Sequence, residues 1–192
     1  MYELFFEKLT EKVALTKGQQ EIIKTYLTPK KLRKKQYLLQ EGDVARNIAF
    51  VEKGALRSYS VDEKGAEHII QFALEGWIIS DLDSFMTGTP ATYNIDALED
   101  CELILISKTA QDEMLKQIPH YEVYIRMQLI GAYVAMQKRL TSILSLSLEE
   151  RYVNFVKLFP DIIQRVPQHM IASFMGLKPE TLSRIRSKMK FK

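Results

Sequence analysis

The sequence predicts an α+β fold in which a β-rich segment lies between two helical segments. From residue 37 to residue 106, short runs of β-branched and aromatic residues alternate with turns that contain glycine, which is typical of strands. From residue 121 to residue 143, apolar residues recur at helical spacing in two stripes. Short helical patterns follow. We therefore expect three units, at residues 1–118, 119–145 and 146–192.

The first 27 residues are expected to form two helices that serve packing. Thr16 and Gln19 are spaced for a capping box at the start of the second helix. Pro29 is expected to end this segment, and a basic run, Lys30–Lys35, follows it. A contact with nucleic acid is one interpretation of such a run, but we favour a solvated entry into a strand.

The β-rich segment divides into six short strands at near-regular spacing, separated by turn signals such as Lys53-Gly54. Many short strands with this spacing favour an all-β barrel or a jelly roll. The strands are expected at Tyr37–Leu39, Ile48–Glu52, Ala55–Val61, His68–Ala73, Thr92–Leu98 and Leu103–Ser107.

A short helix from Thr109 to Ile118 is expected to end at Pro119, and a long helix follows from Tyr121 to Ile143. The two apolar stripes of the long helix indicate two buried faces. We expect one face to pack on the β-rich segment and the other on a second copy of the chain. One broad stripe inside a monomer is the alternative. The residues expected in the dimer interface are Val123, Met127, Ile130, Val134 and Leu144. The second stripe consists of Ile125, Leu129, Ala132, Met136, Leu140 and Ile143.

The C-terminal segment contains the pattern of a helix-turn-helix. A helix over Gln168–Met175 is followed by Gly176, which adopts a left-handed turn at little cost. Pro179 suits the first turn of the second helix, in which Leu182 and Ile185 face inward. The outward residues of that helix, Glu180, Thr181, Ser183, Arg184, Arg186, Ser187 and Lys188, are of the kinds that contact base edges and phosphates in a major groove. The residues expected to bind DNA are Lys178, Glu180, Thr181, Ser183, Arg184, Arg186 and Lys188. A helical hairpin with a basic, solvated face is the alternative.

Charge is distributed unevenly along the chain. Residues 151–192 contain nine Lys and Arg against two acidic residues, a net charge of +7, whereas the whole chain has a net charge of only +3. A basic C-terminal part on an acidic body is the pattern expected of a nucleic-acid-binding unit joined to a regulatory one.

Several classes of site are excluded by residue content. The single cysteine, Cys101, rules out intrachain disulfides and iron–sulfur ligation, and its acidic neighbours are expected to raise its thiol pKa. His68, His120 and His169 stand in three separate segments and form no metal-binding pair. Nucleophile-elbow and phosphate-loop motifs do not occur. We therefore expect no enzyme, no metal and no cofactor. Because the first residues lack a leader and no apolar run reaches the roughly 20 residues of a membrane span, we expect a cytoplasmic protein.

Several stretches resemble a known family. "IASFMGLKPETLSRIRSK" is similar to the recognition segment of Crp/Fnr-type bacterial transcription regulators, most of all the short versions without an extended wing. "LLQEGD", "IAFVEKGALRSYSVDEKGAEH" and "DALEDCELILIS" resemble the β-roll of cyclic-nucleotide-binding domains. The resemblance covers nearly the whole chain. It implies a jelly-roll-like sensory β-roll, dimerisation through the long helix, and a helix-turn-helix that binds a palindromic operator. Only four residues follow Lys188, so we expect no full wing.

The expected effector region departs from the family's phosphate-binding pattern. Ser80–Leu82 stands where the family has its Gly-Glu-Leu segment, and Ala91 stands where the family has the arginine that binds the cyclic phosphate. The stretch Gly76–Thr92 contains no Arg or Lys, but it contains Asp81 and Asp83. An anionic phosphate needs a cation or a nest of N–H groups, so we expect no response to cyclic AMP. The residues expected around an effector pocket are Trp77, Ser80, Asp81, Ala91, Thr92, Tyr93 and Tyr133.

The expected partners are double-stranded DNA, a second copy of the chain, RNA polymerase and a small-molecule effector of unknown identity, with no membrane. Two other functions remain open from the sequence. One is a ligand-binding or protein-interaction scaffold with a β-roll and no DNA target, and the other is a β-barrel enzyme with an unrecognised site.

Overall fold

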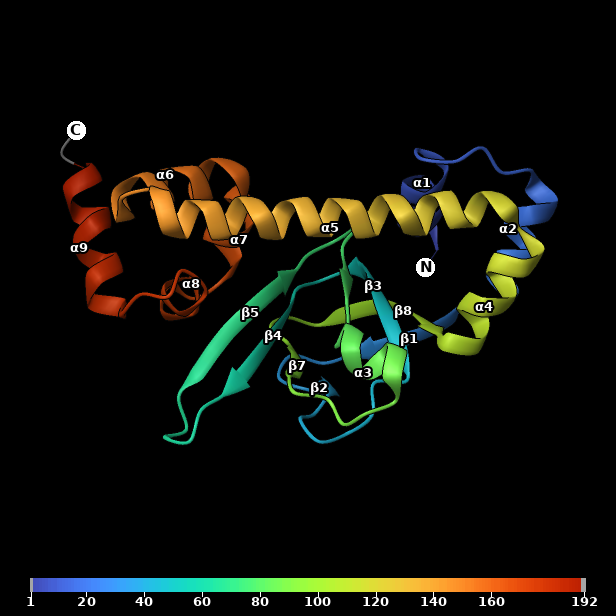
Figure 1. The fold of residues 1–192 in the computed structure, drawn as a ribbon, viewed down its shortest axis with the longest axis horizontal. Coiled ribbons are helices and arrows are strands. Elements are labelled where there is room, and N and C mark those ends of the chain that lie inside the picture. Colours follow the sequence, from blue (N-terminus) through green and yellow to red (C-terminus); the bar gives the residue numbers. More distant parts are fainter. Residues whose placement is uncertain (1, 191–192) are drawn as a thin grey trace.

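The computed structural model describes residues 2–190, and helix α5 (Pro119–Ser145) runs along its longest dimension (Figure 1). Helices α1 (Glu3–Thr10), α2 (Lys17–Thr25) and α4 (Lys108–Gln117) lie towards one end of α5. The strands lie along one side of it. The C-terminal helices gather at the other end, and they are α6 (Leu148–Leu158), α7 (Pro160–Arg165), α8 (Gln168–Phe174) and α9 (Pro179–Lys190).

The strands of residues 2–190 form two antiparallel four-stranded sheets, ordered β1-β8-β3-β6 and β2-β7-β4-β5. Buried apolar side chains such as Val51, Leu56 and Leu103 pack together in one core of this β-roll. A short helix, α3 (Leu82–Thr87), follows β6. The strands are β1 (Thr28–Leu32), β2 (Tyr37–Leu39), β3 (Asn47–Lys53), β4 (Leu56–Val61), β5 (Glu67–Ala73), β6 (Ile78–Ile79), β7 (Asn94–Ala97) and β8 (Cys101–Ser107).

The six expected strands are present with small shifts at their ends, and two strands were missed, β1 and β6. The expectation that Pro29 ends the first segment is wrong, because Pro29 lies inside β1 and pairs in register with Ile104. A proline is tolerated there because β1 is the edge strand of its sheet. The basic run Lys30–Lys35 begins in this solvated strand, and Lys31 pairs with Glu102 at 2.9 Å.

The turn between β3 and β4 requires a glycine. Gly54 has a φ of +100°, a conformation that L side chains rarely adopt. A Cβ at this position would lie 2.7 Å from both the carbonyl oxygen of Asp100 and the Sγ of Cys101. A side chain at position 54 would therefore force these two turns apart.

Helix α5 is covered by its own chain mainly over its first turns. Tyr121 and Tyr124 are buried in a cluster with residues of α1, α2 and α4. From Met127 onward the apolar residues of both stripes are exposed, Met136 by 65% and Leu144 by 76%. The expectation that a whole stripe packs on the β-roll is therefore wrong beyond the first turns, because α1, α2 and α4 surround only that end. No helix within the described residues is long and apolar enough to cross a membrane.

The largest apolar cluster joins the β-roll to the C-terminal helices. From the roll it includes Tyr59, Ile69 and Phe72, and from the C-terminal helices it includes side chains such as Phe155 and Ile171. These residues form one continuous core, which fixes the C-terminal helices against the sheet β2-β7-β4-β5.

Candidate DNA-binding surface and sensory roll

Helices α8 and α9 form the expected helix-turn-helix. Gly176 has a φ of +69°. Its N–H donates to the carbonyl of Ser173 at 2.9 Å, and the N–H of Leu177 donates to the carbonyl of Ala172 at 2.8 Å. This pair of bonds is a Schellman motif, which ends a helix at a left-handed residue. Helix α9 then begins at Pro179, where the missing N–H costs nothing.

The inward residues of the two helices hold the angle between them. Ile171 and Ala172 of α8 and Leu182 and Ile185 of α9 are all buried in the shared core. Ala172 is fully buried, which lets the two helices approach closely. The expectation of an inward apolar face on α9 is confirmed, and the polar face of α9 is consequently turned to the outside.

The residues expected to contact DNA lie on that outer face. Lys178, Glu180, Ser183, Arg184 and Lys188 are exposed, and Thr181 and Arg186 are partly covered. The Nε of Arg184 lies 3.5 Å from the carbonyl oxygen of Glu180, in its own helix. The Nζ of Lys188 lies 3.7 Å from the Oε1 of Glu149 in α6. Arg184 thus has no ion-pair partner within residues 2–190, and Lys188 has a loose one.

Helix α7 anchors the C-terminal helices to the roll through Arg165. Its guanidinium donates to Glu75 at 2.7 and 2.9 Å and to Glu99 at 2.8 and 2.9 Å. Hydrogen bonds to Glu99 and Glu75 hold the pKa of Arg165 above its ordinary value. Glu75 also accepts from the N–H of Gly54 at 2.8 Å. No local pattern predicts this set of ion pairs, because Glu75, Glu99 and Arg165 are far apart along the chain.

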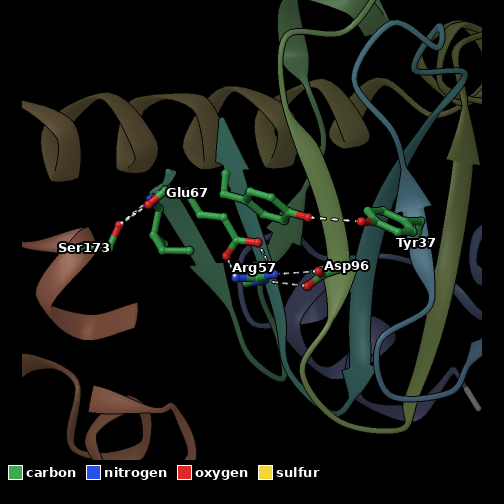
Figure 2. A network of polar contacts seen from close by, with 7 residues as sticks. Tyr37, Arg57, Glu67, Asp96 and Ser173 are labelled. Carbon is green, nitrogen blue, oxygen red and sulfur yellow. Dashed lines mark hydrogen bonds and ion pairs between the residues drawn. The ribbon is translucent and has the colours of Figure 1, made fainter. Parts of the chain in front are cut away.

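A second polar network was also missed, and it runs from the roll to α8 (Figure 2). Arg57 of β4 is buried and donates to both oxygens of Asp96, at 2.8 and 2.9 Å, and also binds Glu67. Burial lowers the pKa of Arg57, but its hydrogen bonds to Asp96 and Glu67 outweigh that effect and raise it. The hydroxyl of Ser173 donates to the carbonyl of Glu67 at 2.9 Å and accepts from the N–H of Ile69 at 3.0 Å. Strand β5 is therefore in direct contact with the first helix of the helix-turn-helix.

The residues expected around the effector pocket do not present an unpaired charge. Asp81 is buried, and its carboxylate accepts from the N–H of Ser84 at 3.0 Å and from the N–H of Thr92 at 2.9 Å. It therefore caps α3 and ties the loop before β7 to it. The Asp81 carboxylate is thus paired within the chain, whereas Asp83 is exposed. Ala91, at the position of the family's arginine, is buried.

Other members of the expected pocket point elsewhere or bond locally. The ring of Trp77 packs edge-on against Phe159 of the C-terminal helices, with centroids 5.7 Å apart. Tyr133 is 61% exposed on α5, and its hydroxyl accepts from Gln137. Ser80 donates to the carbonyl of Asn47, and Tyr93 is partly covered.

A groove of about 550 Å³ lies instead between β5 and the helix-turn-helix. Its lining includes His68, His169, Ser173 and Lys178. No group of three or more His, Cys, Asp or Glu side chains in the described chain is arranged to hold a metal.

Cys101 is buried, and its thiol pKa is raised to about 11. The expected direction is confirmed, but burial is a larger cause than the acidic neighbours.

Comparison with known proteins agrees with this architecture. Residues 29–118 match the family described as the cyclic nucleotide-binding domain. The chain is 26% identical over 171 residues to the regulatory protein HlyX of Actinobacillus pleuropneumoniae, which covers 81% of this chain and 69% of HlyX. It is 25% identical over 167 residues to the fumarate nitrate reduction regulatory protein of Klebsiella oxytoca, covering 81% and 66%. The chain thus spans about two thirds of the length of these relatives.

Two solved structures share the fold. FixK2 from Bradyrhizobium japonicum has a TM-score of 0.72 at 19% identity, covering 86% of this chain and 85% of FixK2. The regulator CLP from Xanthomonas campestris, described as responsive to c-di-GMP, has a TM-score of 0.73 at 15% identity, covering 91% and 92%. The fold therefore joins a cyclic-nucleotide-binding-type roll to a helix-turn-helix. In sequence and fold the chain is similar to transcription regulators of the Crp/Fnr type.

Proposed function

We propose that this chain regulates transcription as a dimer that binds a palindromic operator through α9. The observation that carries the proposal is the outer face of α9, which presents Glu180 and Arg184, with Lys178 just before the helix, while the inner face of α9 is fixed in the core. Arginine reads guanine with two donors, and glutamate accepts from the amino group of cytosine. The lysines and Arg186 neutralise phosphates.

The exposed apolar face of α5 supports the dimer. Leu129, Ile130, Val134 and Leu140 are each at least 38% exposed, and they lie along a single helix. Apolar residues gathered in this way on a surface mark an interface, because isolated ones are normal but contiguous ones are not. We propose that a second copy covers them, which pairs two recognition helices about a common axis. RNA polymerase is the further partner proposed for the DNA-bound dimer.

The roll is proposed not to respond to cyclic AMP or cyclic GMP. Within residues Ser80–Thr92, the carboxylate of Asp81 accepts hydrogen bonds from the N–H groups of Ser84 and Thr92. The same stretch contains no Arg or Lys side chain that could bind a phosphate. An effector of other chemistry is compatible with the fold, and the groove between β5 and the helix-turn-helix is one place where it would contact both units.

Selection of bound DNA from a random-sequence pool tests the proposal. We expect enrichment of a palindrome with two half-sites, and we expect the double variant Glu180→Ala/Arg184→Ala to lose that enrichment while it retains weak binding to all DNA. If the protein is folded and dimeric but enriches no sequence, the proposed function is contradicted, and a scaffold that binds other partners is favoured.

A further inference from the structure

Two arginines hold the end of α8, one residue before the turn of the helix-turn-helix. Arg139 donates to the carbonyl of Phe174 at 2.7 Å, and Arg151 donates to the carbonyl of Met175 at 2.5 Å. The last carbonyls of a helix lack partners within the helix and carry partial negative charge, so cationic donors are favoured there. These contacts fix where the chain enters the turn at Gly176.

Arg139 makes a further contact that Arg151 does not make. Its second terminal nitrogen donates to the carbonyl of Ile70 in β5 at 2.7 Å, and its guanidinium lies over the ring of Phe174, 3.9 Å from the centroid. One planar side chain thus bridges α5, β5 and α8. The planar fork of arginine suits such a bridge, whereas a lysine ammonium is a single point charge. Burial, and then the charge of Arg151, lower the pKa of Arg139.

The position of Arg139 on α5 is unusual. Between Leu129 and Ser145 the side chains of α5 are exposed, except those of Arg139 and Ser142, which are partly covered. The chain itself connects α5 to the C-terminal helices through residues 146 and 147. Arg139 is a main side-chain contact between the exposed half of α5 and the helix-turn-helix. In the proposed dimer α5 is the shared axis, so the placement of α8 relative to α5 sets the separation of the two recognition helices.

We propose that Arg139 is a positioning residue for operator recognition, which fixes the separation of the two half-sites without touching DNA. This inference rests on the proposed function. Each base pair inserted between half-sites moves them apart by about 3.4 Å and rotates one relative to the other by about a tenth of a turn. A dimer whose recognition helices are held rigidly accepts one spacing, and a dimer whose helices are loosely held accepts several.

The test uses the palindrome selected by the unmodified chain and versions with one or two base pairs added or removed at its centre. For the unmodified dimer we expect affinity to fall by about tenfold or more with each change of one base pair. We call the affinity for the selected palindrome divided by the affinity for a version changed by one base pair the spacing ratio. For Arg139→Gln we expect the spacing ratio to fall to about threefold or less. We expect binding to a DNA with a single half-site to stay unchanged within about twofold. Lys138→Gln removes the same charge from the neighbouring, exposed position and should keep the ratio of the unmodified chain.

The outcomes separate the proposals. An Arg139→Gln dimer that keeps the spacing ratio of the unmodified chain overturns the inference. If Arg139→Gln yields no folded dimer, Arg139→Lys decides instead, since it keeps charge and length but cannot hold two carbonyls and a ring face together. An unchanged ratio in Arg139→Lys would then overturn the inference. If the unmodified chain selects no palindrome, the proposed function fails and the role of Arg139 fails with it.

Discussion

Single residues on and next to α9 are predicted to make two kinds of DNA contact. Arg184 is exposed and has no ion-pair partner in the described chain, so its guanidinium is available for a base edge. We expect Arg184→Ala to cost about 1–3 kcal/mol of binding free energy on the selected operator and much less on random DNA. Titrations with both DNAs measure this difference. Equal losses on the two would instead assign Arg184 to phosphate.

The matched control at this scale is Lys178→Ala, at the position immediately before the same helix. A residue that contacts only phosphate should weaken binding to every sequence alike and lower the slope of log affinity against log salt by about one unit. An unchanged slope would place Lys178 off the DNA.

Gly54 tests the packing of the roll. Gly54→Ala should cost roughly 1–3 kcal/mol of unfolding free energy from backbone strain, and roughly 1–3 kcal/mol more from crowding against Asp100 and Cys101. Gly42→Ala is the control, because Gly42 has a φ of +90° but nothing within 4 Å of an added Cβ. Urea unfolding of both variants isolates the crowding cost. Equal losses would show that the turns move apart to admit a methyl group.

Among the elements, α5 carries the clearest prediction. Val134→Glu places a charge in the exposed apolar stripe, so we expect monomers with poor operator affinity. Ala135→Glu, on the same helix but off both stripes, should remain dimeric. Sedimentation velocity distinguishes the two states. A dimer that survives Val134→Glu would place the interface on another surface.

The elements that sequence predicted best are those specified by local chemistry. The capping box of Thr16 and Gln19, the left-handed Gly176 and the first-turn Pro179 are present as expected, because each depends on residues within a few positions. The pairing of Arg57 with Asp96, 39 residues away, follows from which strands become neighbours, and no local pattern specifies that. The prediction that one stripe of α5 packs on the β-roll is wrong for most of the helix, because an apolar stripe shows that a face is buried but does not identify its partner.

For the molecule as a whole, the absence of Arg and Lys from the stretch Gly76–Thr92 predicts how the roll responds to cyclic nucleotides. A charge-assisted contact to phosphate contributes about 1.5–3 kcal/mol, or one to two decades of affinity. We expect no saturable heat when cyclic AMP or cyclic GMP is titrated to millimolar concentration, and no change in operator affinity. A calorimetric titration of the same protein sample with operator DNA is the control, because it shows that the protein is competent to bind DNA. Saturable heat with tighter operator binding would mean that a cation from elsewhere reaches the site.

The core shared by the roll and the C-terminal helices limits which parts of this chain can be exchanged with parts of other proteins. A fragment that contained only residues 146–192 would leave Phe155 and Ile171 without the roll side chains that bury them, such as Tyr59 and Phe72. A chimera that joined these helices to the roll of another regulator would need the matching half of that apolar surface as well. Exchange of the DNA specificity of this chain is therefore expected to succeed through the outer face of α9 alone, with the scaffold left intact.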